Sequence, residues 1–298
     1  RSQLLNNVAE QNLLISTAKA ANVTDLFEYL VPRDYVSSEA AIRSFNAKLK
    51  GAGIRAWGLD GAREYFSDAG GPAALYAGAD ALIAFNSRAA ANERFVGFQT
   101  DMEPQDGQGS FPPSFHNGLP DSGLSTTGGG AVYPTQAQDR EMLMRDWIKI
   151  QSTVSQKLHA AGLRMGSAMP SWTSDYYGEE IKVTYNGTRQ GVMKFMMGII
   201  DDYIVMSYNT NPNNAANRVL AQATYADTIP LNSRPRVYGS LETNAGVGSG
   251  ISYGDTAGKK SKTAVLTDMK TFESILKSHP SFCGLAIHDW DGWLYLPQ

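Results

Sequence analysis

Three polar side chains, Gln99, Asp101 and Glu103, follow one another at a spacing of two residues. They come at the end of an apolar run, residues 94–101, that has the pattern of a β-strand. Because side chains alternate between the two faces of a strand, these three share one face. Polar side chains on a buried face are costly unless they are hydrogen-bonded or used. The spacing therefore indicates a functional site.

Paired carboxyl groups of this kind can cleave a glycosidic bond. One carboxylic acid protonates the leaving oxygen, and a second carboxylate attacks the sugar or activates a water molecule. A like-charged neighbour raises the pKa of such an acid, and Asp101 could supply that charge beside Glu103. Glu242 ends another apolar run, residues 236–241. We therefore interpret Asp101, Glu103 and Glu242 as the candidate catalytic residues.

Other polar and aromatic side chains also stand where predicted strands end. In an α/β barrel the active site lies at the C-terminal ends of the strands, so these side chains converge on one rim. Aromatic faces can stack on sugar rings, and polar groups can bind hydroxyls. The candidate substrate-binding residues are Glu28, Asp60, Gln99, Trp172, Tyr208, Asn209, His288 and Trp290.

Strands and helices are predicted to alternate along the whole chain, which indicates a parallel sheet with covered faces. The predicted strands are residues 24–30, 54–59, 94–101, 163–169, 203–208, 236–241 and 282–288. The predicted helices are residues 3–23, 38–49, 72–90, 141–161, 214–225 and 263–277. A Gly- and Pro-rich insertion, from about residue 105 to 134, is expected to be a loop that walls one side of a cleft.

The fold class that fits this alternation is α/β, and we favour a (β/α)8 TIM barrel over a doubly wound open sheet. The Gly-rich nucleotide-binding turn of the open sheet is absent from the sequence. Only seven strands are predicted, and the first strand of a barrel is not evident at the N-terminus. No composition break marks a linker, so residues 1–298 are expected to form a single domain.

Composition excludes several classes of partner. The formal net charge is −3 and no long basic run occurs, so nucleic acid is not expected to bind. No apolar run is long enough to span a membrane. The four histidines are scattered and no Cys/His cluster exists, so we expect no metal and no cofactor. We expect a monomer whose partner is a polysaccharide or oligosaccharide.

Two Asn-x-Thr triplets, at Asn22 and Asn186, have the pattern of N-glycosylation sites in secreted proteins. The chain begins with Arg1 rather than Met, as expected of a processed chain. We therefore expect an extracellular glycoprotein. The single cysteine, Cys283, cannot form an intrachain disulfide, and its strand position predicts a buried, inert thiol.

Three segments resemble the chitinase-type (family 18) glycoside hydrolases. Residues 95–104, FVGFQTDMEP, resemble the signature Gly-φ-Asp-φ-Asp-φ-Glu of their fourth strand, where φ is apolar or aromatic. Residues 205–209, VMSYN, resemble their Met-x-Tyr-Asp/Asn motif, and Trp290 resembles the tryptophan that closes their last strand. The resemblance implies a TIM barrel with glycosidase activity, with Glu103 as the acid.

The sequence also departs from this family. Gln99 stands in place of the first aspartate, and Asn209 stands where aspartate is commoner. A glutamate at the end of strand seven, as Glu242 is, resembles the "4/7" glycosidases, in which strand four gives the acid/base and strand seven the nucleophile. The motifs Asp-Met-Glu-Pro, Glu-Thr-Asn and Ala-Ile-His-Asp together are similar to a group of microbial barrel proteins classed as glycosidases.

Three functions follow from these residues. The first is a retaining glycoside hydrolase in which Glu103 is the acid/base and Glu242 the nucleophile, about 5 Å apart. The second is a substrate-assisted hydrolase of N-acetyl or amino sugars, in which Asp101 and Tyr208 orient the acetamido group and Glu242 is dispensable. The third is a non-catalytic carbohydrate-binding protein on a barrel scaffold, a lectin or defence protein, which Gln99 in place of aspartate favours.

Overall fold

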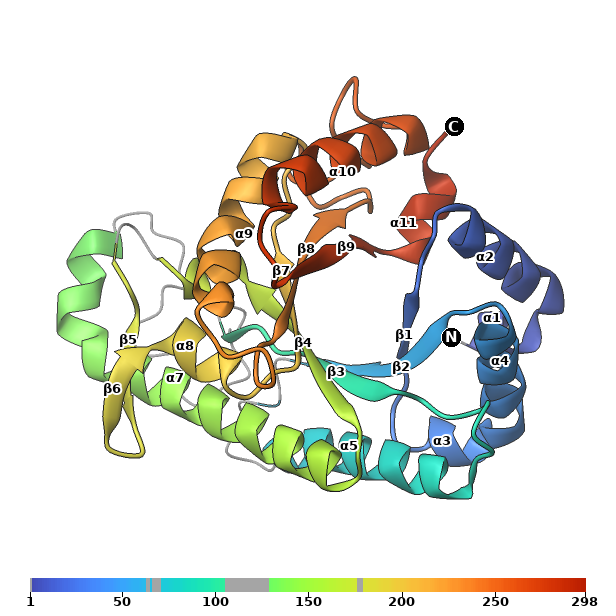
Figure 1. Ribbon diagram of the computed structural model, residues 1–298, viewed down its shortest axis with the longest axis horizontal. Helices are drawn as coiled ribbons and strands as arrows, with labels where there is room; N and C mark the ends of the chain where they lie inside the picture. Colours follow the sequence, from blue (N-terminus) through green and yellow to red (C-terminus); the bar gives the residue numbers. More distant parts are fainter. Residues whose placement is uncertain (1, 63–64, 66–70, 105–128, 176–178) are drawn as a thin grey trace. The chain divides into compact units, whose positions relative to one another are not determined.

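The computed structural model describes residues 2–62, 65, 71–104, 129–175 and 179–298 (Figure 1). The chain forms two compact units, Arg1–Gly166 (unit 1) and Ser167–Gln298 (unit 2). In each unit strands alternate with helices, which confirms the predicted α/β class. Closure of the strands into a barrel stays a prediction, and so does the grouping of the whole chain into a single domain.

The strands of unit 1 are parallel and pair in the order of the chain: β1 (Asp25–Tyr29), β2 (Arg55–Asp60) and β3 (Gly97–Asp101). Their register sets Glu28 beside Gly58 and Leu59 beside Gln99. β4 (Arg164–Pro170) begins in this unit, where the Arg164 amide donates to the carbonyl of Val96. The apolar runs of the sequence therefore predicted these strands correctly.

The helices of unit 1 are α1 (Ser2–Asn6), α2 (Val8–Ala20), α3 (Asp34–Ser37), α4 (Glu39–Gly51), α5 (Gly71–Arg88) and α7 (Gly129–Ala160). Asn7 divides the helix predicted over residues 3–23, because its side chain caps α2 by accepting a hydrogen bond from the Glu10 amide. α7 runs beside α5 (Figure 1). It begins at Gly129, so the predicted loop is wrong for residues 129–134; residues 105–128 lie outside the described residues.

Aromatic side chains fill the space between the strands of unit 1 and its helices. The rings of Tyr35, Phe85 and Phe95 contact one another with centroids 5.4–6.0 Å apart, and all three residues are buried. Each such side chain contributes about 2 kcal/mol or more by burial. Gly58 of β2 faces the same layer, where an added Cβ would lie 2.4 Å from Cδ1 of Leu82.

Unit 2 holds the parallel strands β7 (Asp202–Met206), β8 (Arg236–Glu242) and β9 (Phe282–His288) and the antiparallel hairpin β5 (Lys182–Tyr185) and β6 (Thr188–Gly191). Its helices are α8 (Val192–Met197), α9 (Pro212–Asp227), α10 (Lys262–Leu276) and α11 (Trp290–Tyr295). α9 and α10 lie side by side (Figure 1). The hairpin, α8 and α11 were not predicted, whereas the three parallel strands were.

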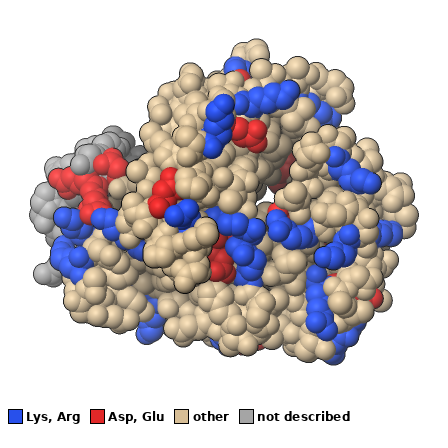
Figure 2. All heavy atoms as spheres, in the orientation of Figure 1, with Lys and Arg blue, Asp and Glu red and all other residues tan. Residues whose placement is uncertain are grey.

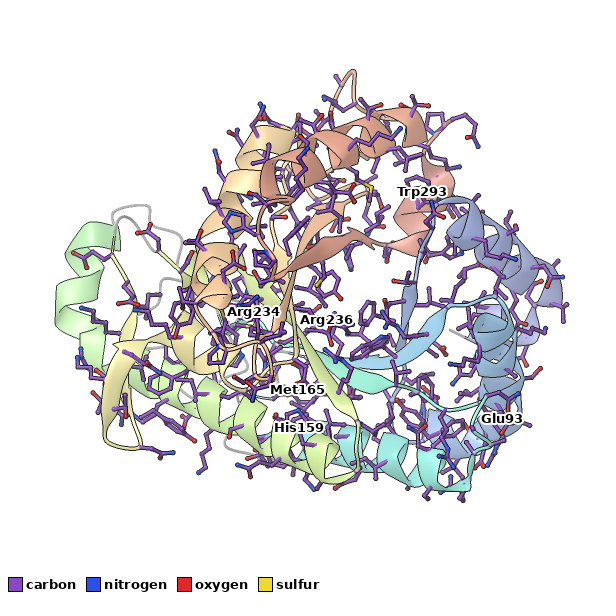
Figure 3. The ribbon with its side chains drawn as sticks, in the orientation of Figure 1. Glu93, His159, Met165, Arg234, Arg236 and Trp293 are labelled. Atoms are coloured by element: carbon purple, nitrogen blue, oxygen red, sulfur yellow. The ribbon has the colours of Figure 1, made fainter. Side chains whose placement is uncertain are left out.

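Ionic and polar contacts fix the N-terminal ends of the strands in unit 2. Arg236, labelled in Figure 3, lies at the start of β8. It donates through Nε to Oδ1 of the buried Asp202 at 2.6 Å. Arg234, just before β8, donates to the carbonyls of Ile229 and Asp227 at 3.0 Å. Both arginines therefore tie the start of β8 to its neighbours, and they lie at the end of the strand opposite to Glu242.

The surface carries charges of both signs. On the face shown in Figure 2, lysine and arginine side chains are interspersed with aspartate and glutamate. Among the residues that the structure describes, no helix combines the length and the apolar character needed to cross a membrane.

Replacing Gly97 by alanine is expected to destabilise unit 1 by about 2 kcal/mol or more, because overpacked cores relax poorly. An added Cβ would lie 2.3 Å from the Trp57 ring and 2.5 Å from the carbonyl oxygen of Arg164, which is backbone. Urea unfolding measures the effect. The matched control is Gly51→Ala, at a position with nothing within 4 Å, which should unfold at the wild-type urea concentration or above it.

Candidate functional site

Gln99 and Asp101, the first two members of the polar series, lie on the face of β3 opposite to the helices of unit 1. Thr100 faces the helices, where its hydroxyl donates to Oε1 of Gln151 on α7 at 2.8 Å. Alternation therefore turns Gln99 and Asp101 to the opposite face. Glu103 follows two residues later and is half-buried. The structure thus brings Gln99 and Asp101 together on one face, with Glu103 next in the chain.

Close packing holds this end of β3 in place. Gly61, which follows β2, has no room for a side chain, because an added Cβ would lie 2.7 Å from Cβ of Asp101. Gln99 is 8% exposed, and its Oε1 is buried with no hydrogen-bond partner among the described residues. Buried amide oxygens are nearly always paired. This oxygen is therefore a buried acceptor whose donor is not among the described residues.

Glu28 and Asp60, also predicted to bind substrate, lie on the other face of the same strands. Glu28 is registered beside Gly58 of β2. A Cβ added at Gly58 would point toward Tyr35 and helix α5, so the Glu28 side chain is on that face as well. Asp60 meets the same helix, since a Cβ at Gly78 would lie 3.1 Å from Oδ2 of Asp60. The structure therefore brings these two carboxyls together against the helices and separates them from Gln99 and Asp101.

The environment of Glu28 favours its neutral form. The residue is 8% exposed, and its Oε1 has no hydrogen-bond partner among the described residues. Burial raises the pKa of Glu28 to about 8. The pKa of the neighbouring Tyr35 hydroxyl is raised as well, first by burial and then by the negative charges of Glu28 and Asp60. Glu28 is thus a titratable group enclosed by the helix layer.

In unit 2, Glu242 at the end of β8 is held on both of its oxygens. Its side chain is 4% exposed. Oε1 accepts hydrogen bonds from the backbone amide of Asn244 at 2.7 Å and from Nδ2 of Asn244 at 3.0 Å. Oε2 lies 2.8 Å from Nδ1 of His288, the residue registered beside Glu242 on β9. Because a carboxylate only accepts hydrogen bonds, Nδ1 of His288 is the donor.

His288 contacts the buried Glu242 and is itself partly exposed at the surface. Its side chain is 52% exposed, and its ring stacks on that of Tyr208 with centroids 6.1 Å apart and planes inclined by 26°. Arg218 of α9 donates to the carbonyl of Tyr208 at 2.7 Å and so holds the segment after β7. With the proton on Nδ1, a neutral imidazole has its lone pair on Nε2. The cluster Glu242, His288 and Tyr208 can therefore accept a hydrogen bond or a proton.

The loop after β8 fixes the surroundings of this cluster. The carboxylate of Asp255 accepts hydrogen bonds from the backbone amides of residues 246–248 at 2.7–2.9 Å, which lower the pKa of Asp255. The Ser252 hydroxyl donates to the carbonyl of Asn244. The Thr243 hydroxyl donates to the carbonyl of His288 at 3.0 Å and so ties the ends of β8 and β9 together.

The remaining predicted residues of unit 2 lie near the ends of its strands. Asn209 is engaged in a local turn, in which its Oδ1 accepts a hydrogen bond from the Asn211 amide at 2.8 Å. Trp172 lies in a short 3-10 helix, Ser171–Thr173, and is half-buried. Trp290 begins α11, and its Nε1 is buried with no hydrogen-bond partner among the described residues.

Two residues that the sequence analysis left unassigned contribute to these surroundings. Asn244 donates twice to Glu242, and its position in the Glu-Thr-Asn segment was a usable signal, because asparagine commonly bonds backbone and side chains two residues away. Tyr35 lies against Glu28 and Asp60. Nothing in its sequence context indicates this position.

Both predicted glycosylation asparagines lie on exposed turns. Asn22 connects α2 to β1 and has a φ of 54°, and Asn186 is at the turn of the β5–β6 hairpin with a φ of 48°. An exposed turn is accessible to modification. The N-glycosylation of these two asparagines stays a prediction. Cys283 is exposed rather than buried, so that prediction was wrong: it lies at the start of β9, where its Sγ is 3.4 Å from the carbonyl of Ser281.

Within the described part of the chain, no group of three or more His, Cys, Asp or Glu residues has the arrangement needed to hold a metal ion. Neither protein-family models nor curated proteins match the sequence.

Solved structures that match with probability 1.00 include the following two chitinases. One is the chitinase from Chromobacterium violaceum ATCC 12472, with 14% identity over 78% of this chain and a TM-score of 0.41. The other is catalytic domain 2 of the Ostrinia furnacalis Group II chitinase, with 12% identity over 77% of this chain and a TM-score of 0.39. This chain covers 65% and 60% of their lengths, less than two thirds of either. They are of the class that the sequence motifs resemble.

Proposed function

We propose that the protein is a glycoside hydrolase that cleaves a polysaccharide or oligosaccharide, with Glu103 as the proton donor. The observation that carries the proposal is the polar series at the end of β3, where Gln99 and Asp101 share one face and Glu103 follows. In α/β barrels, the fold predicted from the sequence, the side chains at the C-terminal ends of the strands are those that act on substrates.

In the proposed reaction, the carboxylic acid of Glu103 gives its proton to the glycosidic oxygen while the bond between that oxygen and the anomeric carbon breaks. Positive charge develops on the sugar ring, and the carboxylate of Asp101 stabilises it or orients the attacking group. Water completes the hydrolysis and Glu103 recovers its proton. Paired carboxyl groups perform this cleavage without a cofactor.

A substrate-assisted reaction on N-acetyl sugars is the second candidate, and the enclosure of Glu242 favours it. A nucleophile must reach the anomeric carbon, whereas the Glu242 side chain is 4% exposed and both of its oxygens are engaged. In the substrate-assisted route the acetamido oxygen attacks instead, and Asp101 orients that group. Glu242 is then not needed for the chemical step.

We also propose that the protein is an extracellular, N-glycosylated monomer. The exposed turn positions of Asn22 and Asn186 support glycosylation. Enzymatic removal of N-glycans from the protein isolated from its natural source should lower its apparent mass, and the double variant Asn22→Gln/Asn186→Gln should show no such shift.

Release of reducing ends from a panel of polysaccharides tests the proposed function. The panel contains chitin, galactosaminogalactan, mannan, a β-glucan and an α-glucan. We expect the wild type to release reducing ends from at least one of them. Absence of release from all five, together with binding on a glycan array, would replace the hydrolase by a carbohydrate-binding protein.

A further inference from the structure

We propose that Glu242 is a positioning residue, and that the His288 ring it holds accepts a hydrogen bond from a glycan hydroxyl through Nε2. The proposal rests on the proposed action on glycans, and it gives unit 2 a substrate contact of its own. It also replaces the role of nucleophile that sequence reasoning gave to Glu242.

The enclosure of Glu242 is the first step of the argument. Three N–H donors surround its carboxylate: the backbone amide and Nδ2 of Asn244 on Oε1, and Nδ1 of His288 on Oε2. Its side chain is 4% exposed. A carboxylate that is buried and hydrogen-bonded in this way can fix the orientation and the tautomer of the histidine beside it.

The second step is the state of the His288 ring. Its Nδ1 points at a group that can only accept, so the neutral ring keeps its proton on Nδ1 and its lone pair on Nε2. Stacking against Tyr208 fixes the plane of the ring, and half of the side chain is exposed. Such a fixed acceptor suits an alcohol, which donates one hydrogen bond. Sugar hydroxyls are alcohols, so a glycan provides the matching donor.

A second histidine–carboxylate pair in the same unit provides an internal control. Nδ1 of His279 lies 2.7 Å from Oδ2 of Asp227, whose Oδ1 accepts a hydrogen bond from the Ser281 amide at 2.9 Å. Asp227 ends α9 and His279 precedes β9, so this pair lies at the opposite end of β9 from His288. The proposal gives it no part in glycan binding.

Nitrogen NMR of the histidine side chains at alkaline pH shows directly which nitrogen of the His288 ring carries the proton. In the wild type, we expect His288 to carry its proton on Nδ1. In Glu242→Gln, the amide oxygen continues to accept from Asn244, so the amide NH2 faces the ring and the proton moves to Nε2. The His279 signals should not change. A wild-type His288 with its proton on Nε2, or an unchanged ring in Glu242→Gln, would overturn the positioning role.

Binding is tested on the protein with Glu103→Gln, so that no probe is cleaved. The probes are a pentasaccharide from each of the five polysaccharides of the panel. His288→Asn keeps an N–H for Glu242 but is too short to place an acceptor where Nε2 lies, so we expect Kd to rise about three- to tenfold for a probe that binds. Adding Glu242→Gln should raise Kd little further, because both changes remove the same contact. Asp227→Asn should leave Kd unchanged.

The outcomes separate this inference from the proposed function. If a pentasaccharide binds and shifts the His288 signals while the wild type cleaves nothing, the hydrolase proposal fails and the inference stands. If the wild type cleaves a glycan but no probe shifts His288, the inference fails alone. A fall in kcat of many orders of magnitude in Glu242→Gln with unchanged Kd would make Glu242 the nucleophile and overturn the proposal.

Discussion

Replacing Glu103 by glutamine is expected to lower kcat about 10³-fold on the polysaccharide that the wild type cleaves, within the range of general acid catalysis. Glutamine has the size of glutamate but cannot give a proton to the leaving oxygen. The substituted group acts in the transition state, so KM should change little. Reducing-end release over a range of substrate concentrations measures both constants.

The matched control is Glu273→Gln, which makes the same chemical change on the exposed side of α10. It should keep the kcat and KM of the wild type. A Glu103→Gln protein with kcat within about twofold of wild type would be incompatible with general acid catalysis by this residue. Equal losses in both variants would point to a general loss of folded protein instead.

Glu28→Gln is expected to stabilise the protein at pH 8 and above, by a gain that disappears on acidification. The ordinary pKa of a glutamate is 4.5, and burial raises that of Glu28 to about 8. Between these values the unfolded chain is ionised at this residue while the folded chain keeps its proton. Folding is therefore favoured by Glu28 below pH 4.5, and this contribution is lost as pH rises through about 8.

The difference in free energy of unfolding between Glu28→Gln and wild type should grow with pH to about 5 kcal/mol, since one pKa unit corresponds to about 1.4 kcal/mol. Urea unfolding at a series of pH values from 4 to 9 measures it, and comparing two variants cancels the titration of other groups. A pH-independent difference for Glu28→Gln would show that Glu28 is ionised in the folded protein.

The positions of the strands were predictable from sequence because each is a short apolar run between turn residues. β1, β3 and β9 begin and end within about three residues of the predicted runs. The β5–β6 hairpin was missed, since its strands are four residues long and largely exposed, and polar strands of that length give no apolar pattern. The Asn186–Gly187 pair at its turn was the available signal.

The side chains that each strand end presents were harder to predict. Alternation correctly set Gln99 and Asp101 on one face, but it does not say which face of a neighbouring strand meets the helices. Glu28 and Asp60 were therefore grouped with them, although the register beside Gly58 turns Glu28 to the helix layer. The contact between Glu242 and His288 depends on the register of β8 and β9, and a single sequence does not contain that register.

The dependence of the rate on the leaving group is the most direct measurement of the central claim that Glu103 protonates the departing oxygen. Wild type and Glu103→Gln are compared on the oligosaccharide that the panel identifies and on its dinitrophenyl glycoside, whose leaving group departs without a proton. The loss in kcat/KM should be about 10³-fold on the oligosaccharide and less than about tenfold on the dinitrophenyl glycoside. Equal losses on the two substrates would contradict a proton-donating role for Glu103.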